Sequence, residues 1–248
     1  MLSCVPDNLD QLIGGQSLQA WSQLFIAHMQ TLDDQFDPGH RIDHVLRVTR
    51  TAIQLAQEEG AALDIVLPAA MLHDTKPVGK FDQDRALAST WSAEQTISLL
   101  VNWSYPAEYY PAIKHAILAH SFSAKITPLT LEAKVVQDAD RLDALGAIGI
   151  SRTIAAGFNH GNPLYLYSEP FPRQRSANDQ TNVLDHFYIK LFRLPESFHT
   201  QSAKIEGARR IRTMENYLQE LAHEVGANYL SYDDYCDNGS SVPDEITA

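Results

Sequence analysis

Ala69-Ala70-Met71-Leu72-His73-Asp74 is the stretch that decides the fold of this 248-residue chain. It ends a segment over residues 65–73 that is apolar on every side of a helix, as in a helix buried at the centre of a domain. The C-terminus of a helix carries partial negative charge, which favours a cation there. A neutral imidazole and a carboxylate placed side by side can bind one divalent cation together. The stretch therefore predicts a central helix, with Asp64 as its N-cap, that ends in two metal ligands.

Two other predicted helices supply further ligands of this kind. His44 lies near the start of a helix that runs to Glu59, and Asp140 lies in a helix that follows Thr127-Pro128, an N-cap with proline in the first helical position. Imidazole and carboxylate groups together suit divalent transition metals. We therefore predict that one metal ion is bound by four side chains: His44, His73, Asp74 and Asp140.

Three aspartates occur within six residues of the helix that carries Asp140. Buried carboxylates are unfavourable unless they are paired or bind a metal. Asp140 and Asp143 are three residues apart and share a helix face, so one can be a metal ligand while the other is a general base or an outer acceptor. Asp138 points away from them, and we expect it to cap a helix or to pair with Arg141.

Several cationic residues near these ligands are candidates for binding phosphate oxygens. Arg47 lies three residues after His44 and on the same side of the helix. Lys76 and Lys80 lie in a polar loop that follows Asp74, where the alternative role is solvated surface charge. Arg173 and Arg175 lie in a long Pro- and Asn-rich connection over residues 159–185, which is either a lid that binds polyphosphate or a disordered segment.

Further histidines accompany the predicted ligands. His40 is four residues before His44 and is a second candidate on that helix face. His115 and His120 are five residues apart, so they do not share a face of the predicted helix over residues 112–120. His120 ends that helix, as His73 ends the central one, and we predict that it points into the site. His28, on the apolar stripe of a helix over residues 17–32, is expected to be a core or boundary residue.

The remaining sequence also favours helices and shows no strand ladder. Helical spacing of apolar residues occurs over residues 92–103, with Ser92 as the expected cap, and over residues 148–156, 186–194 and 200–224. Gly146, Gly149 and Gly157 indicate close packing around one of these helices. The residues after 225 are acidic and polar, and we expect them to be loosely held.

Composition limits the classes of function. The chain is 44% hydrophobic, which is enough for a sizeable core, and its net charge is −12, so a nucleic-acid polymer or an anionic membrane surface is not the expected partner. Two cysteines, Cys4 and Cys236, form neither a disulfide framework nor a metal-ligand motif. No signal peptide and no membrane span are evident in the sequence. We expect a cytoplasmic protein and leave open whether it is a homodimer.

Four segments carry a resemblance to a known family. The order His44, His73-Asp74, Asp140 resembles the signature of the HD-domain superfamily of metal-dependent phosphohydrolases. His44-Val45-Leu46-Arg47-Val48, the central helix ending in His73-Asp74, and Ile117-Leu118-Ala119-His120-Ser121 each resemble an element of that family. The segment from Gln137 to Gly149 is similar to a bacterial branch of small HD hydrolases that includes nucleoside-triphosphate pyrophosphohydrolases. The resemblance is strong over residues 40–150 and looser to about residue 224.

The resemblance implies an all-α fold, an HD-domain helical bundle with additional C-terminal helices. Residues 1–36 would supply an N-terminal helix that packs on the core, and residues 37–150 the HD metal-binding core. Residues 151–225 would form a lid-like loop and C-terminal helices of the same domain, and residues 226–248 an acidic tail. The family pattern assigns the metal to His44, His73, Asp74 and Asp140, and the expected cofactor is a divalent ion of Mn, Fe, Co, Ni or Zn.

The expected activity is hydrolysis of a phosphoanhydride or phosphate ester of a small molecule, with a nucleotide as the predicted substrate. Some family members carry a glutamate just after His-Asp, whereas this chain has Thr75-Lys76-Pro77. The base would then be Asp74, Asp143 or water activated by the metal, and His120, Lys76 and Arg47 would assist at the phosphate. Two alternatives are a non-catalytic, metal-stabilised regulatory module and a di-iron oxygenase-type site that uses both His115 and His120.

Overall fold

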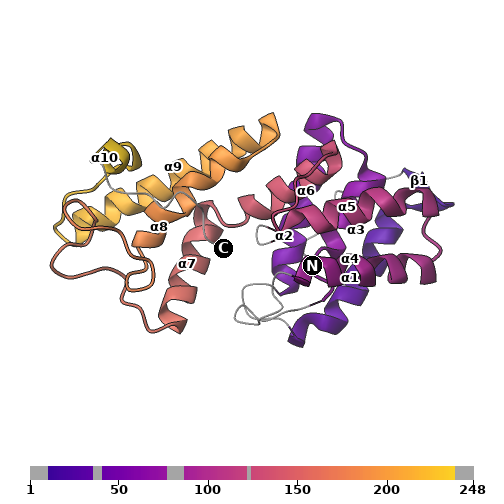
Figure 1. Ribbon diagram of the computed structural model, residues 1–248, viewed down its shortest axis with the longest axis horizontal. Helices are drawn as coiled ribbons and strands as arrows, with labels where there is room; N and C mark the ends of the chain where they lie inside the picture. The colour runs from indigo at the N-terminus through magenta and orange to yellow at the C-terminus, as the bar shows by residue number, and fades with distance from the viewer. Residues whose placement is uncertain (1–10, 36–40, 77–86, 122–123, 238–248) are drawn as a thin grey trace. The chain divides into compact units, whose positions relative to one another are not determined.

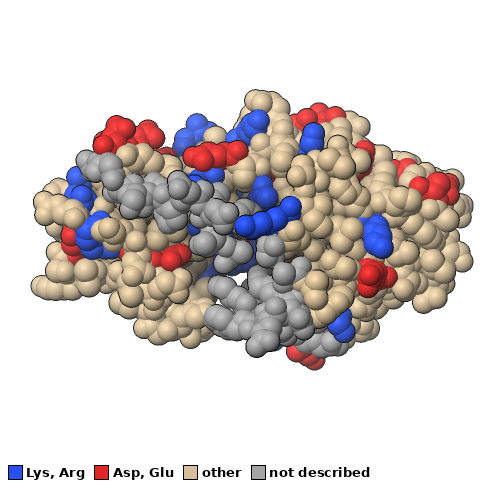
Figure 2. Space-filling model, in the orientation of Figure 1, with Lys and Arg blue, Asp and Glu red and all other residues tan. Residues whose placement is uncertain are grey.

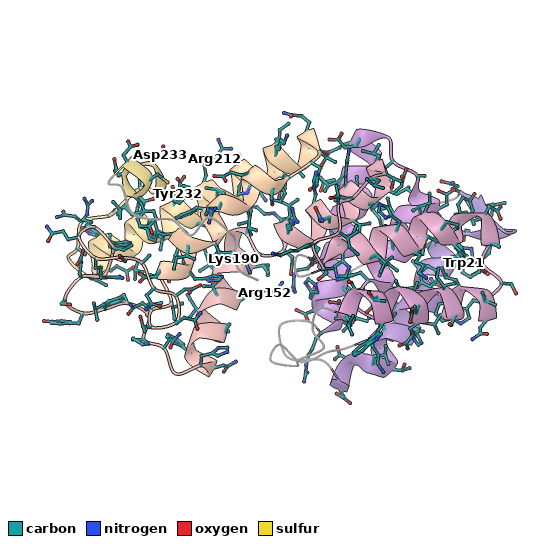
Figure 3. The ribbon with its side chains drawn as sticks, in the orientation of Figure 1. Trp21, Arg152, Lys190, Arg212, Tyr232 and Asp233 are labelled. Carbon is teal, nitrogen blue, oxygen red and sulfur yellow. The ribbon has the colours of Figure 1, made fainter. Side chains whose placement is uncertain are left out.

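The structure is a computed structural model that describes residues 11–35, 41–76, 87–121 and 124–237 (Figure 1). The predicted all-α class is confirmed. In the described part of the chain the strands are β1 (Leu12–Ile13) and β2 (Gln16–Ser17), which pair antiparallel as a short hairpin ahead of α1 (Leu18–Leu32). The hairpin is held by Trp21, labelled in Figure 3, whose indole N–H donates to the carbonyl of Ile13 at 3.1 Å. His28 packs edge-on against Trp103, as expected of a boundary histidine.

The chain divides into two compact units. The first comprises residues 1–142 and 199–203, and the second comprises residues 143–198 and 204–248. The boundary therefore falls after Leu142, whereas the sequence predicts a core that extends to residue 150. The prediction that residues 151–225 belong to the same domain as the core stays a prediction.

The first unit is built around α3 (Leu63–Leu72), whose residues from Val66 to Leu72 are all buried. This helix packs against α1, α2, α5 and α6, while α4 packs against α5 (Figure 1). Because α3 is enclosed on all sides, its apolar sequence has no polar face. The other elements of this unit are η1 (Asp33–Gln35), α2 (Ile42–Glu59), α4 (Ala88–Asn102), η3 (Ala107–Tyr109), α5 (Tyr110–His120), α6 (Leu131–Leu142) and the start of α9 (Gln201–Glu224).

A proline in α3 is compensated by a tyrosine from outside the helix. Pro68 has no backbone N–H, so the carbonyl of Asp64 lacks its usual helical donor. The hydroxyl of Tyr105, a buried residue, donates to that carbonyl at 2.6 Å. The burial of Tyr105 raises the pKa of its hydroxyl, so the group stays protonated and remains a donor at neutral pH.

We expect the Tyr105→Phe substitution to destabilise the first unit by about 1–3 kcal/mol, because a buried carbonyl then has no donor. Denaturant unfolding with and without the substitution measures this free energy. In the Pro68→Ala background the loss should be smaller, since alanine restores the missing backbone N–H at that position. Tyr167→Phe is the control, because Tyr167 is 94% exposed. Equal losses in the two backgrounds would refute this role of Tyr105.

The second unit contains α7 (Gly146–Asn159), α8 (Asp185–Ile189), η4 (Leu191–Ser197), most of α9 and α10 (Tyr232–Asp237). The close packing predicted at the glycines is confirmed: a Cβ on Gly157 would lie 2.2 Å from Cγ2 of Val183. On the face drawn in Figure 2, acidic and basic side chains are interspersed over this unit. Glu206 of α9, for example, pairs with Arg209 and Arg210.

The long connection before α8 is anchored within the second unit by an ion pair. Arg175 donates to both carboxylate oxygens of Asp185, at 2.5 and 2.8 Å, and the backbone N–H of Asn178 donates to the same carboxylate at 2.7 Å. Asp185 is fully buried. Arg173 donates to the carbonyls of Asn228 and Tyr229. Both arginines are therefore engaged inside the unit, which argues against their predicted role in polyphosphate binding.

Several predicted helix boundaries were wrong because tertiary contacts override local signals. The N-cap of α3 is Ala62, not Asp64. Ser92 lies inside α4, where it is buried and accepts the N–H of Lys76 at 3.2 Å. At α6 the capping hydroxyl is that of Thr130, which accepts the N–H of Ala133, rather than that of Thr127. Residues after 225, expected to be loose, include α10, whose Tyr235 is buried. The acidic tail from residue 238 onward lies outside the described residues.

Candidate metal centre

His44 is placed by the start of α2. The first helical residue, Ile42, donates its N–H to Oδ1 of Asp33 at 2.8 Å, so the preceding turn caps the helix from outside. The backbone N–H of His44 donates to the carbonyl of Arg41 at 2.9 Å. Its side chain, in the first turn, is buried, with the residue 2% exposed. The helix start thus fixes a buried imidazole at one end of α2.

His73 and Asp74 follow the last residue of α3. The hydroxyl of Thr96 donates to the carbonyl of Leu72 at 3.0 Å, and the N–H of Thr75 donates to the same carbonyl at 3.3 Å. The ring of His73 contacts the carbonyl of Ala70 through Nδ1 at 2.8 Å. A carbonyl accepts only, so Nδ1 is protonated and Nε2 carries the lone pair. His73 is buried, and its Nε2 has no hydrogen-bond partner within the described ranges.

His120 repeats this arrangement at the end of α5. Its Nδ1 donates to the carbonyl of Ile117 at 2.6 Å, and its Nε2 lies 3.7 Å from Oδ1 of Asp74. The other carboxylate oxygen of Asp74 lies 3.4 Å from Nε2 of His73. The rings of His73 and His120 meet edge to face, with their centroids 4.8 Å apart. Asp74 therefore lies between two imidazoles that present their lone pairs.

Asp140, on α6, completes the cluster. Its Oδ1 lies 3.4 Å from Nε2 of His44, and the side chain is 28% exposed. Two overlapping sets of ligand atoms result, each with all atoms within 4.8 Å of one another: one from His44, His73 and Asp140, and one from His73, Asp74 and His120. Side chains from α2, from α6 and from the ends of α3 and α5 thus meet at one point.

The charges in the cluster favour a cation. Enclosure by the protein opposes ionisation of Asp140, but the hydrogen bond from His44 and the nearby imidazoles outweigh it and hold the pKa of Asp140 well below its usual value. Burial lowers the pKa of His73, although Asp74 acts in the opposite direction. At neutral pH the site therefore combines an ionised carboxylate with a neutral buried imidazole, which is the protonation state that metal binding requires.

The donor set fits a divalent transition metal. Imidazole nitrogen and carboxylate oxygen together suit Mn, Fe, Co, Ni or Zn, and the geometry does not select among them. The buried Nε2 of His73, which lacks a hydrogen-bond partner in the described part of the chain, is the atom whose position such an ion would explain. The structure brings His44, His73, Asp74 and Asp140 together, and His120 joins them; their role as metal ligands stays a prediction.

Three further predicted site residues are Arg47, Lys76 and Asp143. Arg47 forms an ion pair with Asp43 at 2.5 Å on the surface of α2. Lys76 is exposed and borders a groove of about 400 Å³, which it lines with four residues of α4: Trp91, Glu94, Gln95 and Ser98. Asp143 lies in the second unit, where it pairs with Arg152 of α7 (Figure 3). The roles of all three stay predictions.

Of three further predicted histidine and lysine residues, the structure describes His115 alone. His115 accepts the N–H of Leu129 through Nε2 at 2.9 Å at an exposed position, so the di-iron hypothesis that used both His115 and His120 loses one ligand. His40 and Lys80 lie outside the described residues.

Two polar residues next to the ligands were not singled out as functional by the sequence. Asp138 accepts the N–H groups of His199 and Thr200, which precede α9, while the hydroxyl of Thr200 caps that helix by accepting the N–H of Ala203. Gln137, buried, contacts Ala119 of α5 and His199. His199 and Thr200 are about 60 residues away along the chain, so local spacing carries no signal for these contacts.

Comparison with known proteins identifies the family. Residues 41–145 match the HD domain family. An HD-superfamily hydrolase from Bacillus thuringiensis is 31% identical, with a TM-score of 0.66 over 85% of this chain and 99% of that one. This chain belongs to the HD superfamily.

Two other solved structures share the fold along most of their length. YpgQ of Bacillus subtilis, an uncharacterized protein whose crystal structure is of a complex with ADP, is 30% identical, with a TM-score of 0.64 over 83% of this chain and 95% of that one. A protein from Lactobacillus plantarum is 32% identical, with a TM-score of 0.60 over 83% and 99% of the two chains. In the present HD protein, none of the helices within the described ranges is long and apolar enough to cross a bilayer.

Proposed function

We propose that this HD protein is a metal-dependent phosphohydrolase that cleaves a phosphoanhydride or phosphate ester of a small molecule, with a nucleotide as the substrate class. The observation that supports this best is the meeting of His44, His73, Asp74, His120 and Asp140, three imidazoles and two carboxylates, at one point. Membership of a superfamily whose relatives include a hydrolase agrees with it. Fold membership alone does not fix the reaction, so the proposal rests on the donor set.

In this proposal four side chains hold the cation: His44, His73, Asp74 and Asp140. When bound, the cation would supply Lewis acidity, which would polarise a phosphate group and acidify water. The Nδ1–H bonds to Ala70 and Ile117 hold the rings of His73 and His120 in place. These bonds fix the tautomers, so no ring has to rotate before the site works.

His120 is the proposed proton carrier. Its Nε2 faces Asp74 at 3.7 Å and is separate from Nδ1, which is occupied by the carbonyl of Ile117. This nitrogen can accept a proton from attacking water and deliver it to the leaving oxygen, while Asp74 stabilises the imidazolium that forms in between. Asp143, which lies in the second unit, stays a candidate for the base on the sequence alone. Lys76 and Arg47 would offset the negative charge of the phosphate oxygens.

Two observations support a nucleotide rather than a polymer. The crystal structure of the relative YpgQ is of a complex with ADP, at 30% identity to this chain. The net charge of −12 disfavours extended contact with a nucleic-acid backbone. The ADP belongs to YpgQ, so for this chain the nucleotide class is part of the proposal.

The test is release of phosphate and pyrophosphate from nucleoside mono-, di- and triphosphates, measured after metal removal and again after addition of Mn²⁺, Co²⁺, Ni²⁺, Zn²⁺ or Fe²⁺. We expect turnover only with added metal. If the metal raises the melting temperature while no phosphate compound is hydrolysed, the protein is instead a metal-stabilised regulatory module.

A further inference from the structure

The C-terminal end of α5 is held by a side chain from α6. Gln137 is 2% exposed, and its Nε2 donates to the carbonyl of Ala119 at 2.6 Å. This carbonyl belongs to the last turn of α5, where no backbone N–H of the helix remains to pair with it. Ala119 directly precedes His120. The side-chain amide of Gln137 therefore holds the backbone that carries the His120 ring.

The orientation of this amide is set from its other side. Oε1 of Gln137 lies 2.7 Å from Nε2 of His199. Because Nε2 of the amide faces a carbonyl, which only accepts, Oε1 must be the atom that faces His199. Nε2 of His199 therefore carries the hydrogen and donates to Gln137.

The segment that carries His199 is in turn fixed to α6 and α2. The backbone N–H of His199 donates to the carboxylate of Asp138 at 3.0 and 3.1 Å, and both the N–H and the hydroxyl of Thr200 donate to the same carboxylate at 2.8 Å. The N–H of Ser202 donates to Glu59 at 2.7 Å. The segment over residues 199–202 is thus bound to the two helices that carry Asp140 and His44.

We propose that Gln137 is a positioning residue that fixes the spacing between His120 on α5 and the ligand Asp140 on α6, and that His199 holds its amide in the required orientation. Gln137 and Asp140 are three residues apart on one helix, so they move together. This inference deepens the proposed phosphohydrolase function and rests on it. Gln137 acts through backbone and does not touch the phosphate.

The catalytic test uses Gln137→Leu, which removes both hydrogen bonds at similar volume. We expect kcat to fall about tenfold to 100-fold, the usual effect of removing a residue that orients the side chains of a metal site. KM should change little, since the groups proposed to bind phosphate are untouched. Gln219→Leu, at an exposed position of α9, is the matched control and should match the wild-type protein. If kcat falls only in proportion to the folded fraction, the positioning role is refuted.

Variants of His199 test the orientation of the amide. His199→Gln places an amide N–H near the former position of Nε2, so this variant should retain most of the activity. His199→Phe keeps a ring but has no donor, so it should lower kcat as Gln137→Leu does. Equal activity of the two variants would overturn the role assigned to His199.

A spectroscopic readout separates this inference from the proposed function. Imidazole ¹H–¹⁵N signals of metal-free, ¹⁵N-histidine-labelled protein report the His120 ring, which is assigned by the signal lost in His120→Ala. We expect the His120 signals to shift in Gln137→Leu and His199→Phe and to stay in place in Gln219→Leu, whether or not a substrate has been found. Unchanged His120 signals in Gln137→Leu would refute the positioning role even if the enzyme proves active.

Discussion

Asp74→Asn is expected to abolish tight metal binding and to lower metal-dependent phosphate release by more than about 100-fold. This loss exceeds the tenfold to about 100-fold that is usual when a residue that only orients a metal ligand is replaced. The substitution keeps the shape of the side chain but removes its charge. Because 25% of the Asp74 side chain is exposed, water can still reach the new amide, and folding should survive. The carboxylate lies between His73 and His120, where the amide would offer one neutral oxygen.

Metal-dependent thermal stability checks this result without a substrate. A ligand at about 100 times its Kd stabilises the folded state by about 2.7 kcal/mol, so the melting temperature of the wild-type protein should rise on metal addition. That rise should vanish in Asp74→Asn and remain in Asp233→Asn, a matched change at an exposed position of α10 (Figure 3). Wild-type metal affinity in Asp74→Asn would exclude Asp74 as a ligand.

Asp185→Ala is expected to destabilise the second unit by about 3–5 kcal/mol, because removing one partner of a buried ion pair leaves the other charge uncompensated. Asp185 is fully buried, and its carboxylate accepts two bonds from Arg175 and one from Asn178. Amide hydrogen exchange should accelerate over residues 163–185, while the amides of α3, in the first unit, stay protected. Chemical denaturation followed by exchange measures both effects.

Arg209→Ala is the control for this prediction. It removes the partner of Glu206 in the same unit, and because the Arg209 side chain is 60% exposed, the free energy of unfolding should fall by less than about 1 kcal/mol. The double variant Asp185→Leu with Arg175→Met should recover part of the loss, because it leaves no buried charge. If Asp185→Ala is no more disruptive than Arg209→Ala, the ion pair does not anchor the connection before α8.

The sequence predicted the parts of the fold that local chemistry determines. The apolar run before His73 predicted a buried helix, which α3 is, and an imidazole or carboxylate at a helix end or on an inward face indicated a metal ligand. Helix caps were less predictable because several hydroxyls competed for each role. Ser92 was taken as a cap, but it is needed inside α4 to accept the N–H of Lys76. At α6 the capping hydroxyl is likewise that of Thr130 and not that of Thr127.

Features that depend on distant segments could not be read from spacing. The bonds between Asp138 and Thr200 join residues 62 positions apart, and those between Gln137 and His199 are equally long-range. The helix α10 lies in an acidic segment, and it is held by rings rather than by an apolar stripe: Tyr235 packs against Tyr188, with centroids 5.1 Å apart. Because the segment is polar in composition, the sequence predicted a loosely held tail and gave no sign of this contact.

The Nδ1–H bonds of His73 and His120 have a consequence for how the protein would exchange metals. Each ring is bonded to a carbonyl three residues earlier in the chain, at 2.8 and 2.6 Å, so its lone pair would keep one direction whether an ion is present or not. Ordering a free side chain on binding costs about 0.5–1.5 kcal/mol, and these two rings are already ordered. Replacing one ion by another would therefore leave the scaffold unchanged, and the cell's supply of each metal, rather than any adjustment of the protein, would decide which ion it carries.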